Sequence, residues 1–274
     1  MAWINSLFRK RDIIVVIAGF AIMQVLAFLL IDRFMFCPMK GGYDETLEGY
    51  IDIGTNDMSV AARIIGPQKG KKVVIYCHGN AEDLTALEGR FEGLVEKGYA
   101  VATFDYPGYG LSDGAPDEDG CYRNAFRLYD WLVNDKGYQA DDIVVMGYSI
   151  GTGVAIELAT NRDVCGLWLE AAYLSAPRAV TKIRILFADP FSNIGKISKI
   201  KCPLVMLHGT ADSIIPYWQG RELFECAMEP KWFIPIPGAN HIDYIYTMGV
   251  DKYNAGLLEF MQRGRLGNEF CNEK

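Results

Sequence analysis

The sequence predicts an α/β fold: a doubly wound, mostly parallel sheet whose strands alternate with helices. From Tyr43 onward, short apolar runs alternate with amphipathic stretches of helix length. The runs are apolar along their whole length, which is typical of strands buried on both faces of a parallel sheet. The stretches between them are long enough for the right-handed helical crossovers that parallel strands require.

The composition is that of a globular protein. The 274 residues are 50% hydrophobic and 22% charged, which argues against disorder. The formal net charge is −7, and no basic field covers the chain, so we expect no nucleic-acid partner. Because α/β folds often form single domains of this length, we expect one domain over residues 43–264.

The predicted elements follow one another in a regular order. Glu48–Ile53 and Ser59–Ile65 predict a strand pair joined by a polar turn. Further strands are predicted at Lys72–Cys77, Ala100–Phe104, Ile143–Met146, Gly166–Leu169, Leu204–Leu207 and Trp232–Ile236, the last interrupted by Pro235. Helices are predicted at Ala81–Lys97, Asp119–Lys136, Gly151–Asn161, Trp218–Met228 and Val250–Arg263. The long connection over 171–201 is of the kind that is usually functional.

The segment Ile13–Ile31 predicts one transmembrane helix. Its 19 residues carry no charge, and 13 of them are Ile, Val, Leu or Phe. A helix of this length reaches roughly 28 Å, and these side chains favour insertion by roughly 6 kcal/mol. A buried core helix would usually show a polar face, and a cleaved signal peptide would end in small residues. We therefore expect an uncleaved anchor between a tail, residues 1–12, and a linker, residues 32–42.

The flanking charges predict the orientation of this anchor. Three basic residues, Arg9–Arg11, precede it, whereas only Arg33 and Lys40 follow closely. The positive-inside rule then places the N-terminus in the cytoplasm. We expect a single-pass membrane protein with residues 32–274 on the non-cytoplasmic side.

The motif Gly147–Gly151 reads Gly-Tyr-Ser-Ile-Gly and matches G-x-S-x-G. A predicted strand leads into it and a predicted helix follows, which is the context of a nucleophile elbow. Glycines allow the strand and helix to approach closely, and the helix N-terminus places partial positive charge beside Ser149. The alternative is a plain strand–helix turn. We expect Ser149 to be a catalytic nucleophile.

A serine nucleophile needs a base, and the chain has three histidines. His78 and His208 each end a strand before a glycine, where a histidine more often bonds the adjacent loop. His241 follows the last strand, and in doubly wound hydrolases the chain order is serine, acid, histidine. We therefore expect His241 to be the base.

The remaining catalytic groups are an acid and two oxyanion donors. Asp212, just after a strand, is the expected acid, and Glu170 at the end of the neighbouring strand is the alternative. We read Asp105 as structural, because a carboxylate can satisfy backbone donors in the turn that follows it. The expected oxyanion donors are the backbone N–H groups of Ile150 and of Asn80, with Ala81 as neighbour to the latter.

These motifs, in this order, resemble those of the α/β-hydrolase serine hydrolases. The matching segments are Val73–Glu82, Phe104–Gly114, Gly147–Ala159, Cys202–Pro216 and Ile236–His241. The chain is similar in particular to the branch with one N-terminal membrane anchor, which includes esterases and thioesterases. The resemblance implies a Ser149–Asp212–His241 triad and oxyanion N–H groups on Asn80 and Ile150. It covers residues 43–264, with a short cap at about 171–201, and leaves 265–274 as a C-terminal tail.

The expected function is hydrolysis of carboxylic esters or thioesters by a membrane-anchored serine hydrolase through an acyl-enzyme intermediate. No His/Cys/Asp/Glu set has metal-ligand spacing, so we expect no metal and no cofactor. The cap contains Ile183, Ile185, Leu186, Phe187, Phe191 and Ile194, which suggests lipid-like substrates unless these residues only cover the sheet. A peptidase or amidase with the same triad, or a non-catalytic binding domain, is the alternative.

Overall fold

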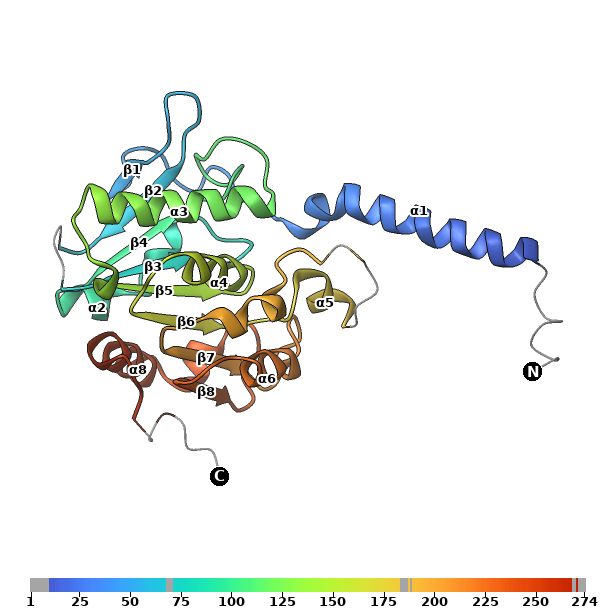
Figure 1. Cartoon of the computed structure of the whole chain (residues 1–274). Helices are drawn as coiled ribbons and strands as arrows, with labels where there is room; N and C mark the ends of the chain where they lie inside the picture. The colour runs from blue at the N-terminus through green and yellow to red at the C-terminus, as the bar shows by residue number, and fades with distance from the viewer. Residues whose placement is uncertain (1–9, 68–70, 183–186, 188, 268–269, 271–274) are drawn as a thin grey trace.

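The structure, a computed structural model, describes residues 10–67, 71–182, 187, 189–267 and 270. Its centre is an eight-stranded sheet in the order β1-β2-β4-β3-β5-β6-β7-β8 (Figure 1). The strands are β1 Tyr50–Asp52, β2 Ala61–Ile65, β3 Val73–Cys77, β4 Ala100–Phe104, β5 Ile143–Tyr148, β6 Gly166–Glu170, β7 Leu204–Gly209 and β8 Lys231–Ile236. The pairs β1–β2 and β2–β4 are antiparallel and the other pairs are parallel. The predicted strand pair and the mostly parallel sheet are confirmed.

Helices cover both faces of this sheet, as the uninterrupted apolar runs predict. In β3, Val73, Ile75 and Cys77 point into one core and Val74 and Tyr76 into the other. All five are fully buried. The first face is covered by α3 Glu118–Asn134, α4 Gly151–Asn161 and α6 Tyr217–Glu225. The second is covered by α2 Glu92–Glu96, α7 Tyr244–Met248 and α8 Val250–Arg263.

The predicted helix Ala81–Lys97 is wrong. The structure has a short 3-10 helix, η2 Leu84–Leu87, followed by a separate helix α2. The Asp83 side chain accepts a hydrogen bond from the Thr85 N–H and begins η2, and Gly89 then takes the left-handed region at φ +69°. Such a residue ends a helix, so the amphipathic pattern alone overestimated its length. Pro235 is tolerated because β8 is an edge strand.

Helix α1, Lys10–Met35, contains the predicted anchor and projects away from the domain (Figure 1). In the part of the chain that the structure describes, no single helix is long and apolar enough to cross a membrane. Two parts of α1, Asp12–Ala27 and Leu29–Met35, meet at an angle of 51° and together have the length and composition for one crossing.

Among its described residues, the connection over 171–201 holds one helix, α5 Ala176–Thr181, and two 3-10 turns, η4 Asn193–Gly195 and η5 Ile197–Lys199. Two of its apolar residues, Phe191 and Ile194, pack into the core beside α4, so for them the covering role is the observed one. Phe187 is 74% exposed. Ile183, Ile185 and Leu186 lie outside the described residues, as do residues 1–9 and residues 268, 269 and 271–274 of the expected tails.

Candidate active site

Ser149 occupies a sharp turn between β5 and α4. Its backbone takes φ +53°, a region that non-glycine residues rarely adopt and that is typical of functional sites. A Cβ on Gly151 would overlap the carbonyl oxygens of Cys77 and His78, and one on Gly147 would overlap α4. Both glycines are therefore required by close approach, and the turn presents Ser149 at the helix N-terminus.

The structure brings the three predicted triad side chains together. His241 Nε2 lies 3.0 Å from Ser149 Oγ, and His241 Nδ1 lies 2.8 Å from Asp212 Oδ2. Ser149 and His241 are 92 positions apart in the chain. They meet because the loops after β5, β7 and β8 all leave the same edge of the parallel sheet.

Asp212 is held as a charged acceptor. Its Oδ1 accepts hydrogen bonds from the Ile214 N–H at 2.9 Å and the Ile215 N–H at 2.8 Å. Burial would raise the pKa of Asp212, but hydrogen bonds from His208 and His241 outweigh it and hold that pKa well below its usual range. Since an ionised carboxylate only accepts, Nδ1 of His241 carries the proton. Nε2 is then free to accept the hydroxyl proton of Ser149.

His78 and Glu170 lie outside this arrangement, and His208 contacts it only through Asp212, whose Oδ2 lies 3.5 Å from His208 Nε2. His78 Nδ1 faces the Gly79 carbonyl at 2.8 Å, and His208 Nε2 faces the Ile215 carbonyl at 2.9 Å, so each bonds an adjacent loop as expected. The fully buried Glu170 forms an ion pair with Arg90. It also accepts hydrogen bonds from Trp168, Tyr244 and Tyr253 at 2.6–2.9 Å. The structure thus pairs His241 with Asp212 and places Glu170 in a buried network.

The two predicted oxyanion donors come from neighbouring segments. Ile150 directly precedes α4, which packs against the end of β3 through Gly151, and Asn80 follows β3 by three residues. Among the described residues, neither the Ile150 N–H nor the Asn80 N–H donates to a protein acceptor. Gly79 N–H donates to Glu82 Oε2 at 2.6 Å, which fixes the loop. The two amides are free to serve an added negative oxygen.

A second buried pair, Asp105 and His78, lies behind the Asn80 loop. Asp105 Oδ2 accepts a short hydrogen bond from the Tyr43 hydroxyl. Its Oδ1 lies 3.6 Å from His78 Nε2, and among described residues neither of these atoms has a hydrogen-bond partner. Burial raises the pKa of Asp105 to about 7, although the Tyr43 hydroxyl opposes the rise. Burial also lowers the pKa of His78.

This pair predicts a pH-dependent stability. Folded Asp105 keeps its proton to about pH 7, whereas in the unfolded chain it ionises near pH 4. Its contribution to stability is therefore present below about pH 4 and is lost as the pH rises through 7. We expect Asp105→Asn to gain in unfolding free energy relative to wild type by up to about 1.4 kcal/mol per pH unit in that window.

Denaturant unfolding at pH 5, 6, 7 and 8 measures this effect. Asp57→Asn, at an exposed turn, serves as the control and should run parallel to wild type. A parallel profile for Asp105→Asn would instead mean that the Asp105 carboxyl has the same pKa in the folded and unfolded states.

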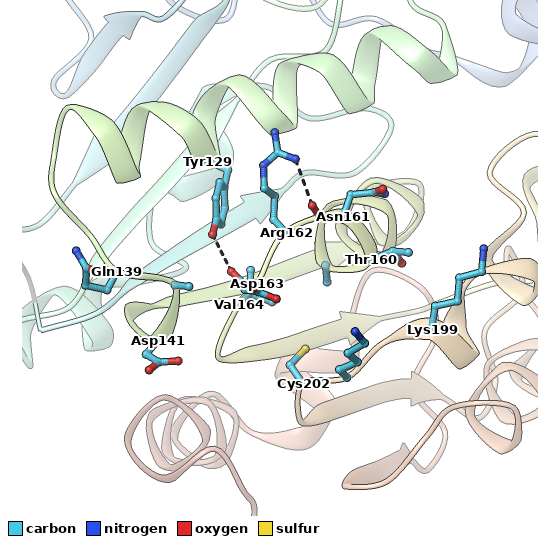
Figure 2. Close-up of a pocket in the computed structure, with 13 residues that line it drawn as sticks. Tyr129, Gln139, Asp141, Thr160, Asn161, Arg162, Asp163, Val164, Lys199 and Cys202 are labelled. Carbon is cyan, nitrogen blue, oxygen red and sulfur yellow. Dashed lines mark hydrogen bonds between the residues drawn. The ribbon is translucent and has the colours of Figure 1, made fainter.

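A separate hollow of about 780 Å³ lies at the opposite edge of the sheet (Figure 2). It is lined by residues that precede β5, β6 and β7, such as Ala140, Val164 and Cys202, and by the end of α4. The Tyr129 hydroxyl donates to the Asp163 carbonyl at 2.8 Å across it. Because ligands in open α/β sheets bind at the carboxyl ends of the strands, we place the candidate site at the triad rather than in this hollow.

Two residues that hold the His241 loop, Asn240 and Tyr148, were not predicted from the sequence. Asn240 Oδ1 accepts from the N–H and Oγ of Ser213, both at 3.0 Å, and so ties the Asp212 loop to the His241 loop. The Tyr148 hydroxyl donates to the His241 carbonyl at 3.0 Å, and its ring stacks near the imidazole with centroids 5.3 Å apart. Their positions beside His241 and Ser149 were the available signal, but their partners are distant in the chain.

Known proteins that are similar to this chain are named as hydrolases or as members of a serine peptidase family. Residues 68–196 match the family described as Serine aminopeptidase, S33. A putative α/β hydrolase of Acanthamoeba polyphaga mimivirus is 33% identical over 230 residues, which cover 81% of this chain and 86% of that protein. The α/β-hydrolase domain-containing protein 17B of Homo sapiens is 33% identical over 177 residues, 63% of this chain and 61% of that protein.

A Caenorhabditis elegans α/β-hydrolase domain-containing protein, aho-3, is 31% identical over 191 residues, 67% of this chain but 57% of that protein. The match thus spans about three fifths of the nematode and human relatives. Among solved structures, an esterase of Pyrococcus furiosus superposes with a TM-score of 0.66 at 19% identity, covering 83% of this chain and 96% of that one. At this identity the likeness shows the fold alone.

Proposed function

This chain belongs to the α/β-hydrolase superfamily, and from that premise we propose that it is a serine hydrolase cleaving carboxylic ester or thioester bonds. The observation that carries the proposal is the position of His241, within 3.0 Å of Ser149 Oγ on one ring nitrogen and 2.8 Å of Asp212 on the other. A hydroxyl, an imidazole and a carboxylate linked in this order by hydrogen bonds form the arrangement that activates a serine for acyl transfer.

The proposed reaction has two halves. Ser149 Oγ attacks the carbonyl carbon while His241 Nε2 takes the hydroxyl proton, and Asp212 stabilises the resulting imidazolium. The oxygen that becomes negative is bound by the N–H groups of Ile150 and Asn80. Collapse of the tetrahedral intermediate breaks the bond to the leaving group, which takes the proton from His241. Water, deprotonated by His241, then hydrolyses the acyl-enzyme and restores Ser149.

A peptidase or amidase using the same triad is the second candidate, and the description of the matching family as a serine aminopeptidase favours it. The two differ in the leaving group. An amine must be protonated before it leaves, whereas an alcohol or thiol leaves more readily, so the same triad hydrolyses esters faster than amides unless the site selects for the amine.

We further propose that the chain is a single-pass membrane protein, with residues 13–31 as the anchor and the domain on the non-cytoplasmic side. The basic flank Arg9–Arg11 supports this orientation. Phe187 supports a membrane-facing cap, because its ring lies 5.7 Å from that of Phe20 and its N–H donates to Gln24 Oε1 at 2.8 Å. The cap residue Phe187 therefore lies against α1.

An apolar rim lies at the same edge of the sheet as the triad. We use that name for Val180, Phe187, Ile214 and Ile242, whose side chains are 60–82% exposed. Each lies in a connection that leaves the carboxyl end of β6, β7 or β8, on the edge of the sheet that carries the triad. Exposed apolar groups gathered at one edge are typical of a lipid-contacting surface. They support an acyl or lipid-like substrate reached from the bilayer.

A substrate panel tests the proposed function. Matched esters, thioesters and amides with acyl chains from two to sixteen carbons are assayed with the purified full chain, soluble or embedded in phosphatidylcholine vesicles. We expect ester or thioester rates to exceed amide rates by at least about 100-fold, and rates to rise with acyl length. A preference for amides would favour the peptidase, and rates that fall with chain length would contradict a lipid-like substrate.

The same panel tests the apolar rim. Val180→Glu places a charge on the rim, so the ratio of vesicle to soluble-acetate activity should fall about tenfold, a loss of roughly 1.4 kcal/mol in apparent binding. Met228→Glu is the matched control, because Met228 is 57% exposed and precedes β8 at the opposite edge. If this activity ratio falls equally in both variants, or falls in neither, the rim does not meet the bilayer.

A further inference from the structure

The Asn80 side chain is hydrogen-bonded to Met35, the last residue of α1, and to Cys37 just after it. We call these hydrogen bonds the Asn80 grip. The Asn80 Oδ1 accepts hydrogen bonds from the Cys37 N–H at 2.9 Å and from the Tyr109 hydroxyl at 2.6 Å. Its Nδ2 donates to the Met35 carbonyl at 2.7 Å. The Cys37 N–H also reaches the Tyr109 hydroxyl at 3.0 Å. Both ends of the amide are therefore engaged, which fixes its orientation.

The segment that makes this grip is itself fixed to the domain. Phe36, between the two gripping residues, is 5% exposed, and its ring packs edge-on against Tyr109 and Phe191 with centroids 6.5 and 6.0 Å away. The Met39 carbonyl then accepts the Gly110 N–H at 2.7 Å. Burying an aromatic ring stabilises such a contact by roughly 1.5–3 kcal/mol, so residues 35–39 form part of the domain rather than a free linker.

The Asn80 grip holds the residue whose backbone N–H is the second expected oxyanion donor. On its N-terminal side the Asn80 loop is held through Gly79 N–H and Glu82, and through a hydrogen bond of 2.6 Å from the Tyr106 hydroxyl to the His78 carbonyl. Among the described residues, Asn80 itself forms hydrogen bonds through its side chain, while its N–H has no acceptor. A donor for a developing oxyanion must be held in place before reaction, because reorganisation during the step would reduce its effect.

We propose that Tyr109 and the segment Met35–Cys37 are positioning elements of the oxyanion site, acting through the Asn80 side chain to hold the Asn80 N–H. The inference rests on the proposed function and adds a second role to the segment behind the anchor: it completes the catalytic site. Tyr109 is fully buried. Its ring packs near those of Phe36, His78 and Tyr106, and its hydroxyl is the group that donates to Asn80.

A double-mutant cycle tests this on the full chain. Asn80→Ala keeps the backbone N–H but removes the grip, so kcat and the rate of fluorophosphonate labelling should fall about 10- to 100-fold, with KM changed less than about threefold. Tyr109→Phe should lower kcat about 3- to 10-fold. In the Asn80→Ala background, Tyr109→Phe should have no further effect on kcat, because the group it acts through is gone.

Tyr129→Phe is the matched control. Tyr129 is also a buried tyrosine whose hydroxyl donates a hydrogen bond, in this case to the Asp163 backbone carbonyl at 2.8 Å, and it lies at the opposite edge of the sheet. It should lose stability as Tyr109→Phe does and keep the wild-type kcat. If Asn80→Ala does not fold, the difference in kcat between Tyr109→Phe and Tyr129→Phe still tests whether Tyr109 positions the oxyanion donor.

Additive losses in the cycle, or a rise in KM at unchanged kcat, would overturn the inference. So would equal kcat values for Tyr109→Phe and Tyr129→Phe. These outcomes differ from a failure of the proposed function, which would appear as activity that survives in Ser149→Ala.

Discussion

Replacing Ser149 with alanine is expected to lower kcat/KM by at least about 10⁴-fold and to abolish covalent labelling by a fluorophosphonate probe. Ser149 supplies the only oxygen that His241 Nε2 contacts among the described residues, at 3.0 Å. Alanine leaves the imidazole with no nucleophile to activate. Labelling of the purified full chain, followed by ester hydrolysis at several substrate concentrations, measures both effects.

Ser175→Ala controls for loss of a buried serine hydroxyl near the same edge of the sheet. Ser175 is fully buried and follows β6, and its Oγ has no hydrogen-bond partner among described residues. This variant should keep wild-type activity within about twofold. Probe labelling that persists in Ser149→Ala, or wild-type protein that is never labelled, would favour a hydrolase-like domain that only binds a partner.

Asp212→Asn and Glu170→Gln are expected to fail in different ways. Asp212→Asn removes the charge that stabilises the His241 imidazolium, so kcat should fall by about 10³- to 10⁴-fold. Its stability should fall as well, because the ionised carboxylate accepts hydrogen bonds from His241 and from two backbone N–H groups. Glu170→Gln leaves the Arg90 guanidinium, 14% exposed, without its carboxylate. Breaking a buried pair in this way costs roughly 3–5 kcal/mol, so stability should fall while folded enzyme keeps kcat within about tenfold.

Chemical denaturation and kcat per active site, titrated with the probe, separate the two variants. Asp243→Asn, whose Oδ1 accepts the Asn240 N–H at 2.6 Å, tests whether any carboxylate near His241 has the same effect. A loss of kcat in Glu170→Gln with an active Asp212→Asn would make Glu170 the catalytic acid. A Glu170→Gln variant as stable as wild type would contradict the structural role of the Arg90 pair.

The strands and the nucleophile turn could be predicted from the sequence because their signals are local. A strand buried on both faces must be apolar at every position, as in β3 and β5. The turn at Ser149 needs glycines where strand, loop and helix approach closely. Gly147 and Gly151 supply them, and both belong to the five-residue motif itself. Both properties belong to a few neighbouring residues, so pattern and spacing were sufficient.

The break between η2 and α2 was not predictable in the same way. An amphipathic pattern over 81–97 fits a single helix, and it is the left-handed Gly89 that interrupts it. The pattern records which residues face the core, but two short helices can present the same faces to the sheet as one long helix. The Asp83 side chain, which begins η2, and the left-handed backbone of Gly89 mark where the two helices separate.

By itself, the sequence determined the alternation of strands and helices, the candidate nucleophile and the short list of candidate acids and bases, since these follow from residue type and local spacing. Only the tertiary structure decided that Asp212 rather than Glu170 meets His241, and that residues 35–37 reach Asn80. Those choices depend on which strand ends are neighbours in the sheet and on groups that are 29 to 92 positions apart. Contacts between such distant residues are set by packing of the whole domain, which local pattern does not encode.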